Sequence, residues 1–420
     1  MVVTKMLLML LIMSGLQPVA AEDHVERASP NTATYTLQEI LTIALERNPR
    51  IEEKHGIVEQ QEGNTLTASS YSNPTISVQS GRGSLRDPSM KTTITERYIT
   101  LSQPLEWPGT RLAQQQAAQA RVKSAQAGLA EAKLNVTART KTVFFDLLLS
   151  QHETVLIKEN VQAMKRLNAA VRARVKAGES PPFEIVKMNV ETLNMHKEWL
   201  RTKGAERSAK AILNSVTAGG LGKAFTIQGE FLSSAGNRDV TKFSEHTLSA
   251  HPKLVKRQER IKEAEQRHRQ ELHARVPNIT LSGSYQRDVG REAFVGGISI
   301  PIPLWNQRQG EIAKAKGVMR QEEAIFLRTR TALHQRIIQE IQNSNIAAAQ
   351  ISTYEHGLLK QAQEALRIAQ VSFQYGEASL LDVLDAQRVF RDTQLEYIRA
   401  KHELSVALTA LEQFTGTLTQ

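Results

Sequence analysis

Apolar and polar residues alternate with a period of two in several short stretches of the chain. The alternation is clearest over 277–287 and 293–303, where every second residue is mostly apolar and the residues between are small, neutral or hydroxyl-bearing. It recurs over 74–82 and, less regularly, over 94–105. This period predicts β-strands with one apolar and one polar face. The four stretches come as two sequence-adjacent pairs, which predicts two β-hairpins.

Two environments fit such strands. A sheet in a water-soluble protein turns its apolar face toward a core, whereas a strand in a bilayer turns it toward lipid. Strands of about ten residues suit a tilted bilayer crossing, and the hydroxyl-rich polar face suits a water-filled lumen. Four strands cannot close a barrel, and open edges in lipid leave backbone groups unpaired at a cost of several kcal/mol each. If the strands cross a bilayer, several chains must therefore share one barrel.

Very long helices are predicted outside the strands. Proline is absent between Thr110 and Lys176, and again from Gln307 to the end of the chain. A helix of about 65 residues is about 100 Å long, which no compact domain requires and which predicts coiled-coil-like packing. A turn at Gly178 ends the first long helix and a turn at Gly376 breaks the second, because glycine accepts the left-handed conformation that ends a helix. Two helical hairpins with tips pointing the same way are expected.

The chain repeats one plan twice. Asn48-Pro49 returns as His251-Pro252, and four such anchor points recur in the same order about 200 residues apart. Each repeat predicts a first helix (Leu37 to about Ser70 in the first), two strands, a long helix, a turn and a return helix. The predicted divisions are a signal peptide over 1–21, a first repeat over 22–213 with its tip near 177–182, an irregular Gly- and Ser-rich connector over 214–244, and a second repeat over 245–420 with its tip near 375–380.

The first residues predict a cleavable signal peptide. Lys5 precedes an apolar core from Met6 to Leu16, and small residues stand before a cut at Glu22. A membrane anchor is the alternative, but it needs about 20 apolar residues and Pro18 ends this run early. The sequence has no cysteine, so neither a disulfide nor a lipid anchor on cysteine is expected.

Charge and motifs exclude several classes of function. The formal net charge is +10, but the basic residues are spread along helical stretches beside Glu and Asp, which indicates solvated helix faces rather than a nucleic-acid site. His268 and His273 lie five residues apart, not the three or four that place two ligands on one helix face. Nucleophile-elbow, phosphate-loop and zinc-protease motifs are missing. We expect no enzyme activity, no cofactor and no resident metal site.

Two segments carry a resemblance to a known family, the outer-membrane efflux proteins or TolC-like channels. The segment 36–49 resembles the family's first helix, and 376–387 resembles its second hairpin tip. The resemblance implies a mainly α fold with a small β part, in which three copies form a 12-stranded β-barrel and a periplasmic α-barrel of 12 helices. It also implies an outer-membrane location in contact with lipid. The implied partners are a periplasmic adaptor (membrane-fusion) protein and an inner-membrane pump of the resistance–nodulation–division type.

Acidic residues near the tips are the candidate entrance residues. Asp382 and Asp385 are three apart and share a helix face. The resemblance implies that they line the periplasmic entrance, where threefold symmetry makes acidic rings that favour cations. Glu184 is the equivalent acid of the first tip, and Lys187 replaces its second acid. The alternative is an ordinary acidic first turn, stabilised by the helix dipole. Ala378 stands where some relatives have an arginine that locks the entrance, so that contact is not expected.

A motif at the strand-to-helix junction suggests the cargo. The segment 104–111 is similar to the subgroup that serves heavy-metal pumps, which implies export of cobalt, zinc, cadmium, copper or silver. A channel for drugs, organic solutes or secreted proteins remains an alternative. A periplasmic adaptor or a helical scaffold without a pore is an alternative of another class, which the tandem repeat disfavours. The junction residues singled out are Pro104, Trp107, Pro108, Gly109, Pro303 and Trp305.

Overall fold

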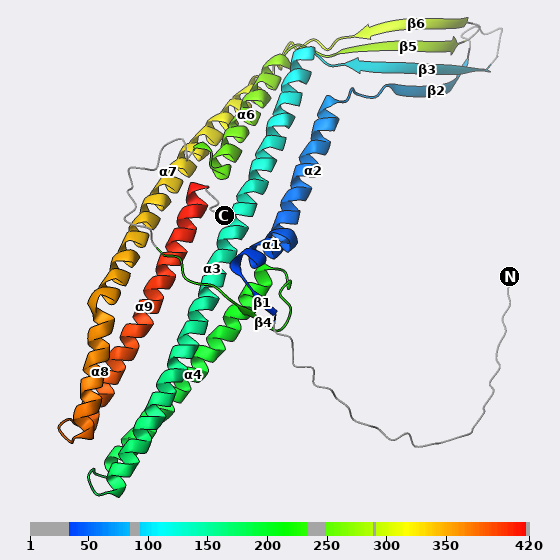
Figure 1. Ribbon diagram of the computed structural model, residues 1–420. Helices are drawn as coiled ribbons and strands as arrows, with labels where there is room; N and C mark the ends of the chain where they lie inside the picture. Colours follow the sequence, from blue (N-terminus) through cyan, green and yellow to red (C-terminus); the bar gives the residue numbers. More distant parts are fainter. Residues whose placement is uncertain (1–32, 85–92, 234–248, 289–290, 417–420) are drawn as a thin grey trace, which may run out of the picture.

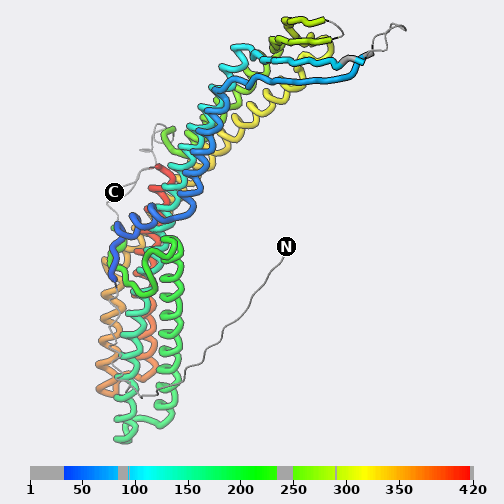
Figure 2. The backbone as a smooth tube through the Cα atoms, turned by 90° about the vertical axis from the view of Figure 1, so that its right-hand side faces the viewer, coloured from blue at the N-terminus to red at the C-terminus, as the bar shows by residue number. Residues whose placement is uncertain are grey.

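The computed structural model describes residues 33–84, 93–233, 249–288 and 291–416. The predicted signal peptide and its cleavage point lie outside the described residues. A four-stranded sheet occupies one end of the molecule, and two helical hairpins end at the other (Figure 1). Seen from the side, the long helices bend between the two ends (Figure 2). Within the described residues, none of the helices is both long and apolar enough to cross a bilayer.

The sheet joins the two predicted β-hairpins edge to edge. Its order is β2-β3-β5-β6, and every neighbouring pair is antiparallel. The central pair, β3 with β5, brings together strands from the two repeats. Among the residues that the structure describes, each outer strand therefore has one edge without a partner. The strands are β2 (Thr75–Ser84), β3 (Thr93–Leu105), β5 (Ile279–Asp288) and β6 (Arg291–Ser299).

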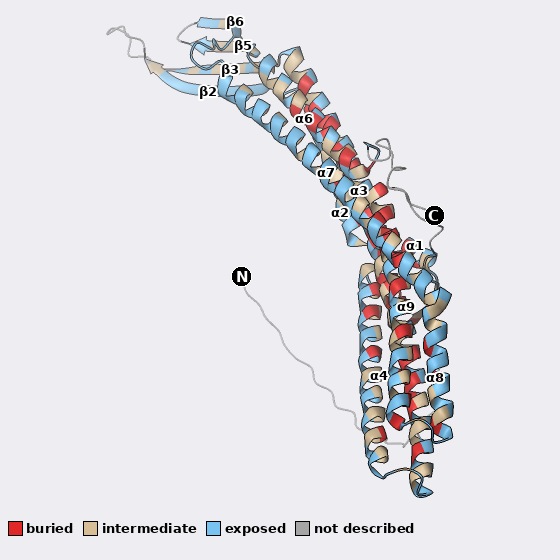
Figure 3. Cartoon of the chain, turned by 90° about the vertical axis from the view of Figure 1, so that its left-hand side faces the viewer, coloured by how far each residue is buried: buried red, intermediate tan, exposed pale blue. Residues whose placement is uncertain are grey.

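The register gathers most of the apolar residues of the four strands on one face. Ile76 lies opposite Leu101, and Leu281 lies opposite Ile298. Directly paired residues of antiparallel strands share a face, so β3 joins the apolar face despite its irregular pattern. Most of this face is uncovered: the exposed fraction is 41% at Leu105, 43% at Leu281 and 87% at Phe294 (Figure 3). A sheet that packs its apolar face on a soluble core does not fit this exposure.

The first helix is broken, contrary to the expectation of one helix from Leu37 to about Ser70. It forms α1 (Leu37–Arg47) and α2 (Pro49–Ser69). Proline disfavours the helical conformation in the residue before it, and Asn48 is extended with a ψ of 120°. The Asn48 side chain then caps α2 by accepting a hydrogen bond from the Arg50 amide at 3.0 Å.

Helix α3 (Pro108–Lys176) is the longest helix among the described residues and runs from the sheet to the first hairpin tip. Its 69 residues make it about 100 Å long. Close to the sheet, α3 packs against α6 and α2, and several of its alanines are buried, among them Ala113, Ala117 and Ala120. Farther from the sheet, Phe144 and Phe145 lie in a hydrophobic core that includes Ile40 of α1. The other long helices are α4 (Phe183–Val216), α6 (Pro252–His273), α7 (Gln309–Thr353), α8 (Leu359–Gln374) and α9 (Leu380–Thr415).

A π-helical turn (Tyr354–Leu358) separates α7 from α8, where an uninterrupted helix was expected. The Tyr354 hydroxyl donates to Glu396 at 3.1 Å, and the Tyr397 hydroxyl donates to Glu355 at 2.7 Å. These two bonds fasten the turn to α9. Such turns need support from outside the helix, because their own geometry is unfavourable.

The connector between the repeats is not wholly irregular, contrary to expectation. Helix α4 continues to Val216, and β4 (Phe225–Ile227) pairs in parallel with β1 (Ala33–Tyr35). Both apolar residues of β4 are buried in the core around Phe144. A three-residue strand is too short for its alternation to be noticed in the sequence. Residues 234–244 of the predicted connector lie outside the described part of the chain.

Candidate functional site at the hairpin tips

Both hairpins end in the same backbone turn, at the end of the molecule far from the sheet (Figure 1). Gly178 and Gly376 each have a φ of +79°, in the left-handed region that glycine adopts without strain. The amide of Glu179 donates to the Arg174 carbonyl at 2.9 Å, and the amide of Glu377 donates to the Ser372 carbonyl at 2.8 Å. These closing bonds satisfy carbonyls at the helix ends and fix the tips.

A small apolar core joins the two hairpins just above the tips. Met164 and Val171 of α3 and Met188 of α4 pack with Phe373 of α8 and Val383 of α9. All five side chains are at most 5% exposed. The relative position of the two tips is therefore set by packing between the repeats.

Asp382 caps the helix that it begins. Its carboxylate accepts hydrogen bonds from the Ser379 amide at 2.9 Å and the Ser379 hydroxyl at 2.7 Å, while that hydroxyl accepts from the Asp382 amide. These bonds hold the pKa of the Asp382 carboxyl below its usual value. The geometry thus gives Asp382 the capping role of the alternative interpretation. The carboxylate also remains exposed and negatively charged.

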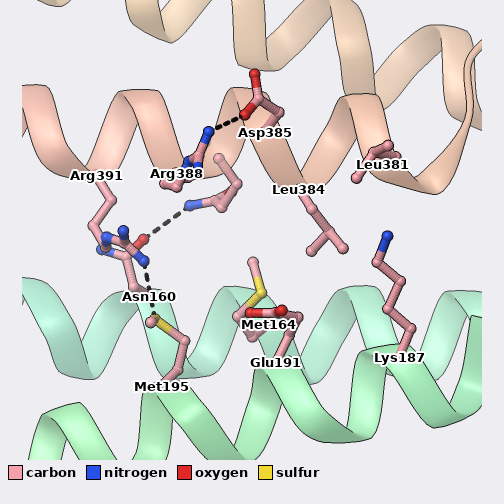
Figure 4. Close-up of a pocket in the computed structure, with 11 residues that line it drawn as sticks. Asn160, Met164, Lys187, Glu191, Met195, Leu381, Leu384, Asp385, Arg388 and Arg391 are labelled. Carbon is pink, nitrogen blue, oxygen red and sulfur yellow. Dashed lines mark hydrogen bonds and ion pairs between the residues drawn. The ribbon is translucent and has the colours of Figure 1, made fainter.

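Asp385 lies one turn further along α9 and is exposed. It forms an ion pair with Arg388. Glu184 lies in the first turn of α4, where its Oε2 atom is buried and has no hydrogen-bond partner in the described part of the chain. Lys187 shares a groove with Asp385, whereas Glu184 does not line that groove (Figure 4). Of the three predicted entrance acids, only Asp385 lines this groove.

The groove lies between the first hairpin and α9 (Figure 4). A buried hydrogen bond from Gln387 to Asn160, 2.8 Å long, crosses it from α9 to α3. Arg391 reaches the sulfur of Met195 at 3.5 Å. The remaining lining residues are Met164, Lys187, Glu191, Leu381, Leu384, Asp385 and Arg388.

Arg174 was not anticipated from the sequence, and it links the two hairpins directly. Its guanidinium donates to the Phe373 carbonyl and lies 4.6 Å from the centre of the Phe373 ring. Its Nε atom is 3.6 Å from a carboxylate oxygen of Glu179. Arg174 and Phe373 are far apart in sequence, so no local pattern marks the contact.

The structure also positions the residues of the strand-to-helix junction. Pro108 is the first residue of α3, and the Trp107 amide donates to the Asn278 side chain at 3.3 Å. Gly109 lies close to His273: a Cβ atom there would lie 2.8 Å from the ring of this exposed side chain, which would have to move. Trp305 is 89% exposed. Pro104 lies opposite Thr280 in the sheet, and Pro303 follows β6 in the segment that leads to α7.

No group of three or more His, Cys, Asp or Glu side chains in the described residues could hold a metal ion.

Comparisons with known proteins agree with this architecture. The outer membrane efflux protein family matches residues 40–218 and 244–417. The cobalt-zinc-cadmium resistance protein CzcC of Cupriavidus metallidurans is 24% identical over 385 residues, which cover 91% of this chain and 90% of that protein.

Two solved structures have the same fold. Outer membrane protein VceC of Vibrio cholerae matches with a TM-score of 0.77 at 19% identity, over 90% of this chain and 96% of VceC. CusC matches with a TM-score of 0.80 at 16% identity, over 90% of this chain and 91% of CusC. The family match spans both repeats, and the predicted mainly α fold with a small sheet is confirmed. This chain therefore belongs to the outer membrane efflux protein family and is an outer-membrane channel protein of the TolC-like type.

Proposed function

We propose that three copies of this chain form a channel that passively conducts heavy-metal cations out of the cell. An inner-membrane pump of the resistance–nodulation–division type would supply the energy, and a periplasmic adaptor protein would join it to the channel. The observation that carries the proposal is the sheet, which has one uncovered apolar face and two open edges.

The sheet fits a shared barrel. Its apolar face suits lipid, and the opposite face carries rows of hydroxyl groups such as Thr75, Ser102 and Ser282, which suit water. Pairing β2 of one copy with β6 of the next would satisfy both open edges. Three copies would supply 12 strands. The exposed Trp107 and Trp305 would lie where tryptophan is favoured, at the boundary between lipid and water.

The helices can also close into a ring, in which each copy contacts the next through two different surfaces. Helices α8, α9, α3 and α4 lie in one row, with α8 and α4 at its two ends (Figures 1 and 3). Each end helix carries exposed apolar residues, and those over 183–193 and 368–375 follow the spacing of three or four residues that is the pattern of a coiled-coil seam. Contact between α4 of one copy and α8 of the next is heterologous and closes into a ring. These exposed residues are Phe183, Val186, Val190, Leu193 and Leu200 on α4, and Leu358 just before α8, Ile368 and Val371 on α8, and Tyr375 just after it.

The tips would form the entrance of this ring. Three copies of Asp382 and Asp385 would concentrate negative charge there, which favours cations over anions. Both carboxylates are exposed, so they would attract a divalent cation without the tight binding that slows its exit. The groove beside Asp385, with its mixture of Leu, Met, Lys and Arg, is available to the adaptor protein.

The metal cargo is supported by the likeness to a protein named for cobalt, zinc and cadmium resistance and by the junction segment 104–111. Deletion of the gene should lower tolerance to at least one of cobalt, zinc, cadmium, copper and silver, and the chain supplied in trans should restore it. Sensitivity to drugs or organic solutes instead of metals would favour the other cargoes. Unchanged tolerance to the whole metal panel would overturn the metal assignment.

A further inference from the structure

One side chain in each repeat ties the start of one helix to the end of another. In the first repeat, the Asn48 side chain accepts from the Arg50 amide at 3.0 Å at the start of α2. Its amide nitrogen donates to the carbonyl of Val216, the last residue of α4, at 2.8 Å. Asn48 thus fastens the beginning of α2 to the end of α4.

His251 makes the equivalent pair of bonds in the second repeat. Its Nδ1 atom accepts from the Lys253 amide at 3.1 Å at the start of α6. Its Nε2 atom is 3.1 Å from the carbonyl oxygen of Gln413, in the last turn of α9. The side chain is 4% exposed. We call each of these two-bond links between a helix start and a helix end a joint. The two joints match in position and bonding, but only the second contains a group that titrates near neutral pH.

These bonds fix one protonation state of the His251 ring. Since Nδ1 accepts from an amide and Nε2 faces a carbonyl, the ring must be neutral with its proton on Nε2. A second proton on Nδ1 would place two donors against each other and would end the capping bond to Lys253. It would also put a positive charge at a helix N-terminus, where the helix dipole opposes it.

We propose that His251 is a pH-sensitive joint, which fastens the end of α9 to the start of α6 when neutral and releases it when protonated. The Asn48 joint would stay closed at the same pH. If the proposed entrance is correct, release would loosen α9, the helix whose other end carries Asp382 and Asp385. The joint itself does not depend on the cargo.

The charges around the ring agree with a neutral joint at neutral pH. Burial, the largest influence, and the neighbouring Lys253 of α6 lower the pKa of His251, while the Gln413 carbonyl and Glu131 of α3 raise it. Glu131 is paired with Lys256 of α6. The net pKa lies below the ordinary value, so the folded chain binds this proton less readily than the unfolded chain does. The contribution of this joint to the stability of the folded chain is therefore complete above about pH 6.5. It is lost as the pH falls through the folded-state pKa of His251.

Hydrogen exchange of the purified full-length protein tests the joint. Between about pH 7.5 and pH 5, after correction for the intrinsic rate of each amide, exchange should become several-fold faster at 253–256 and 411–416. The first joint, at 50–53 and 213–217, serves as the control within the same molecule and should keep its protection.

Two variants complete the test. His251→Asn copies the first joint, so its second joint should stay protected at both pH values. Asn48→His should make the first joint sensitive to pH as well, and it decides the question if His251→Asn does not fold. Unchanged protection of the wild-type second joint at low pH would overturn the proposal, as would equal losses in wild type and His251→Asn. Neither result bears on the metal panel, so the joint and the proposed function can fail separately.

Discussion

Replacing Arg174 with methionine should let the two hairpin tips separate more often. The substitution keeps most of the apolar stem and removes the guanidinium. It therefore removes the hydrogen bond to the Phe373 carbonyl, the contact with the Phe373 ring and the ion pair with Glu179.

The expected magnitude follows from these three contacts. A hydrogen bond from a charged donor contributes about 1.5–3 kcal/mol, and a partly buried cation–π contact contributes about 1 kcal/mol. The Glu179 carboxylate is largely exposed, so its ion pair adds little. A total of about 3 kcal/mol corresponds to a shift of about 100-fold in the equilibrium between joined and separated tips, at 1.4 kcal/mol per tenfold change.

Single-channel recording in a planar bilayer measures this shift as a rise in the fraction of time spent in the open state. The control is Arg172→Met, because Arg172 bonds only to Asn168 and Asn189 of its own hairpin in the described contacts. That variant should behave like the wild type. If both variants open equally often, or if Arg174→Met does not differ from the wild type, the tips are not held by this contact.

Three further predictions concern packing, capping and conduction. Gly229→Ala should lower stability by about 1–3 kcal/mol, because a Cβ atom there lies 2.8 Å from a buried aromatic ring of α3. Gly56→Ala, in open space on α2, should raise stability by up to about 1 kcal/mol. Thermal unfolding checks both variants. Asp382→Ala should lower the unfolding temperature through loss of its cap. Because hydrogen bonds from Ser379 lower the pKa of Asp382, that loss should be constant above about pH 4 and should disappear as the pH falls through the folded-state pKa. Asp385→Asn should reduce the preference of the channel for cations, measured as a reversal potential, and should leave the unfolding temperature within about 1 °C, because its ion pair is exposed.

The sequence predicts the elements of this fold well because their signals are periodic and long. Strand alternation, the proline-free helices and the duplicated plan each extend over many residues, so local exceptions do not hide them. The breaks are harder to foresee. Pro49 does mark the break at Asn48, because proline disfavours the helical conformation in the residue before it. The π turn, in contrast, depends on tyrosine–glutamate bonds to a different helix.

The site is less predictable because its contacts are distant in sequence. Gln387 meets Asn160 across 227 positions, and Arg174 meets Phe373 across 199. Neither contact has a local pattern. The capping role of Asp382 could have been recognised, since a serine three residues before an acidic residue at a helix start is the pattern of a capping box. His251 was visible only as the counterpart of Asn48, and its two bonds required the structure.

The most direct test of the central claim is membrane fractionation of the expressed protein combined with cysteine cross-linking. The chain has no cysteine, so Val190→Cys on α4 together with Ile368→Cys on α8 creates the only thiols present. The account predicts that the protein is in the outer-membrane fraction and that oxidation gives a ladder ending at three chains. Each single variant should not give that ladder. A protein that remains a single chain in the soluble periplasmic fraction would contradict the channel and would favour a scaffold without a pore.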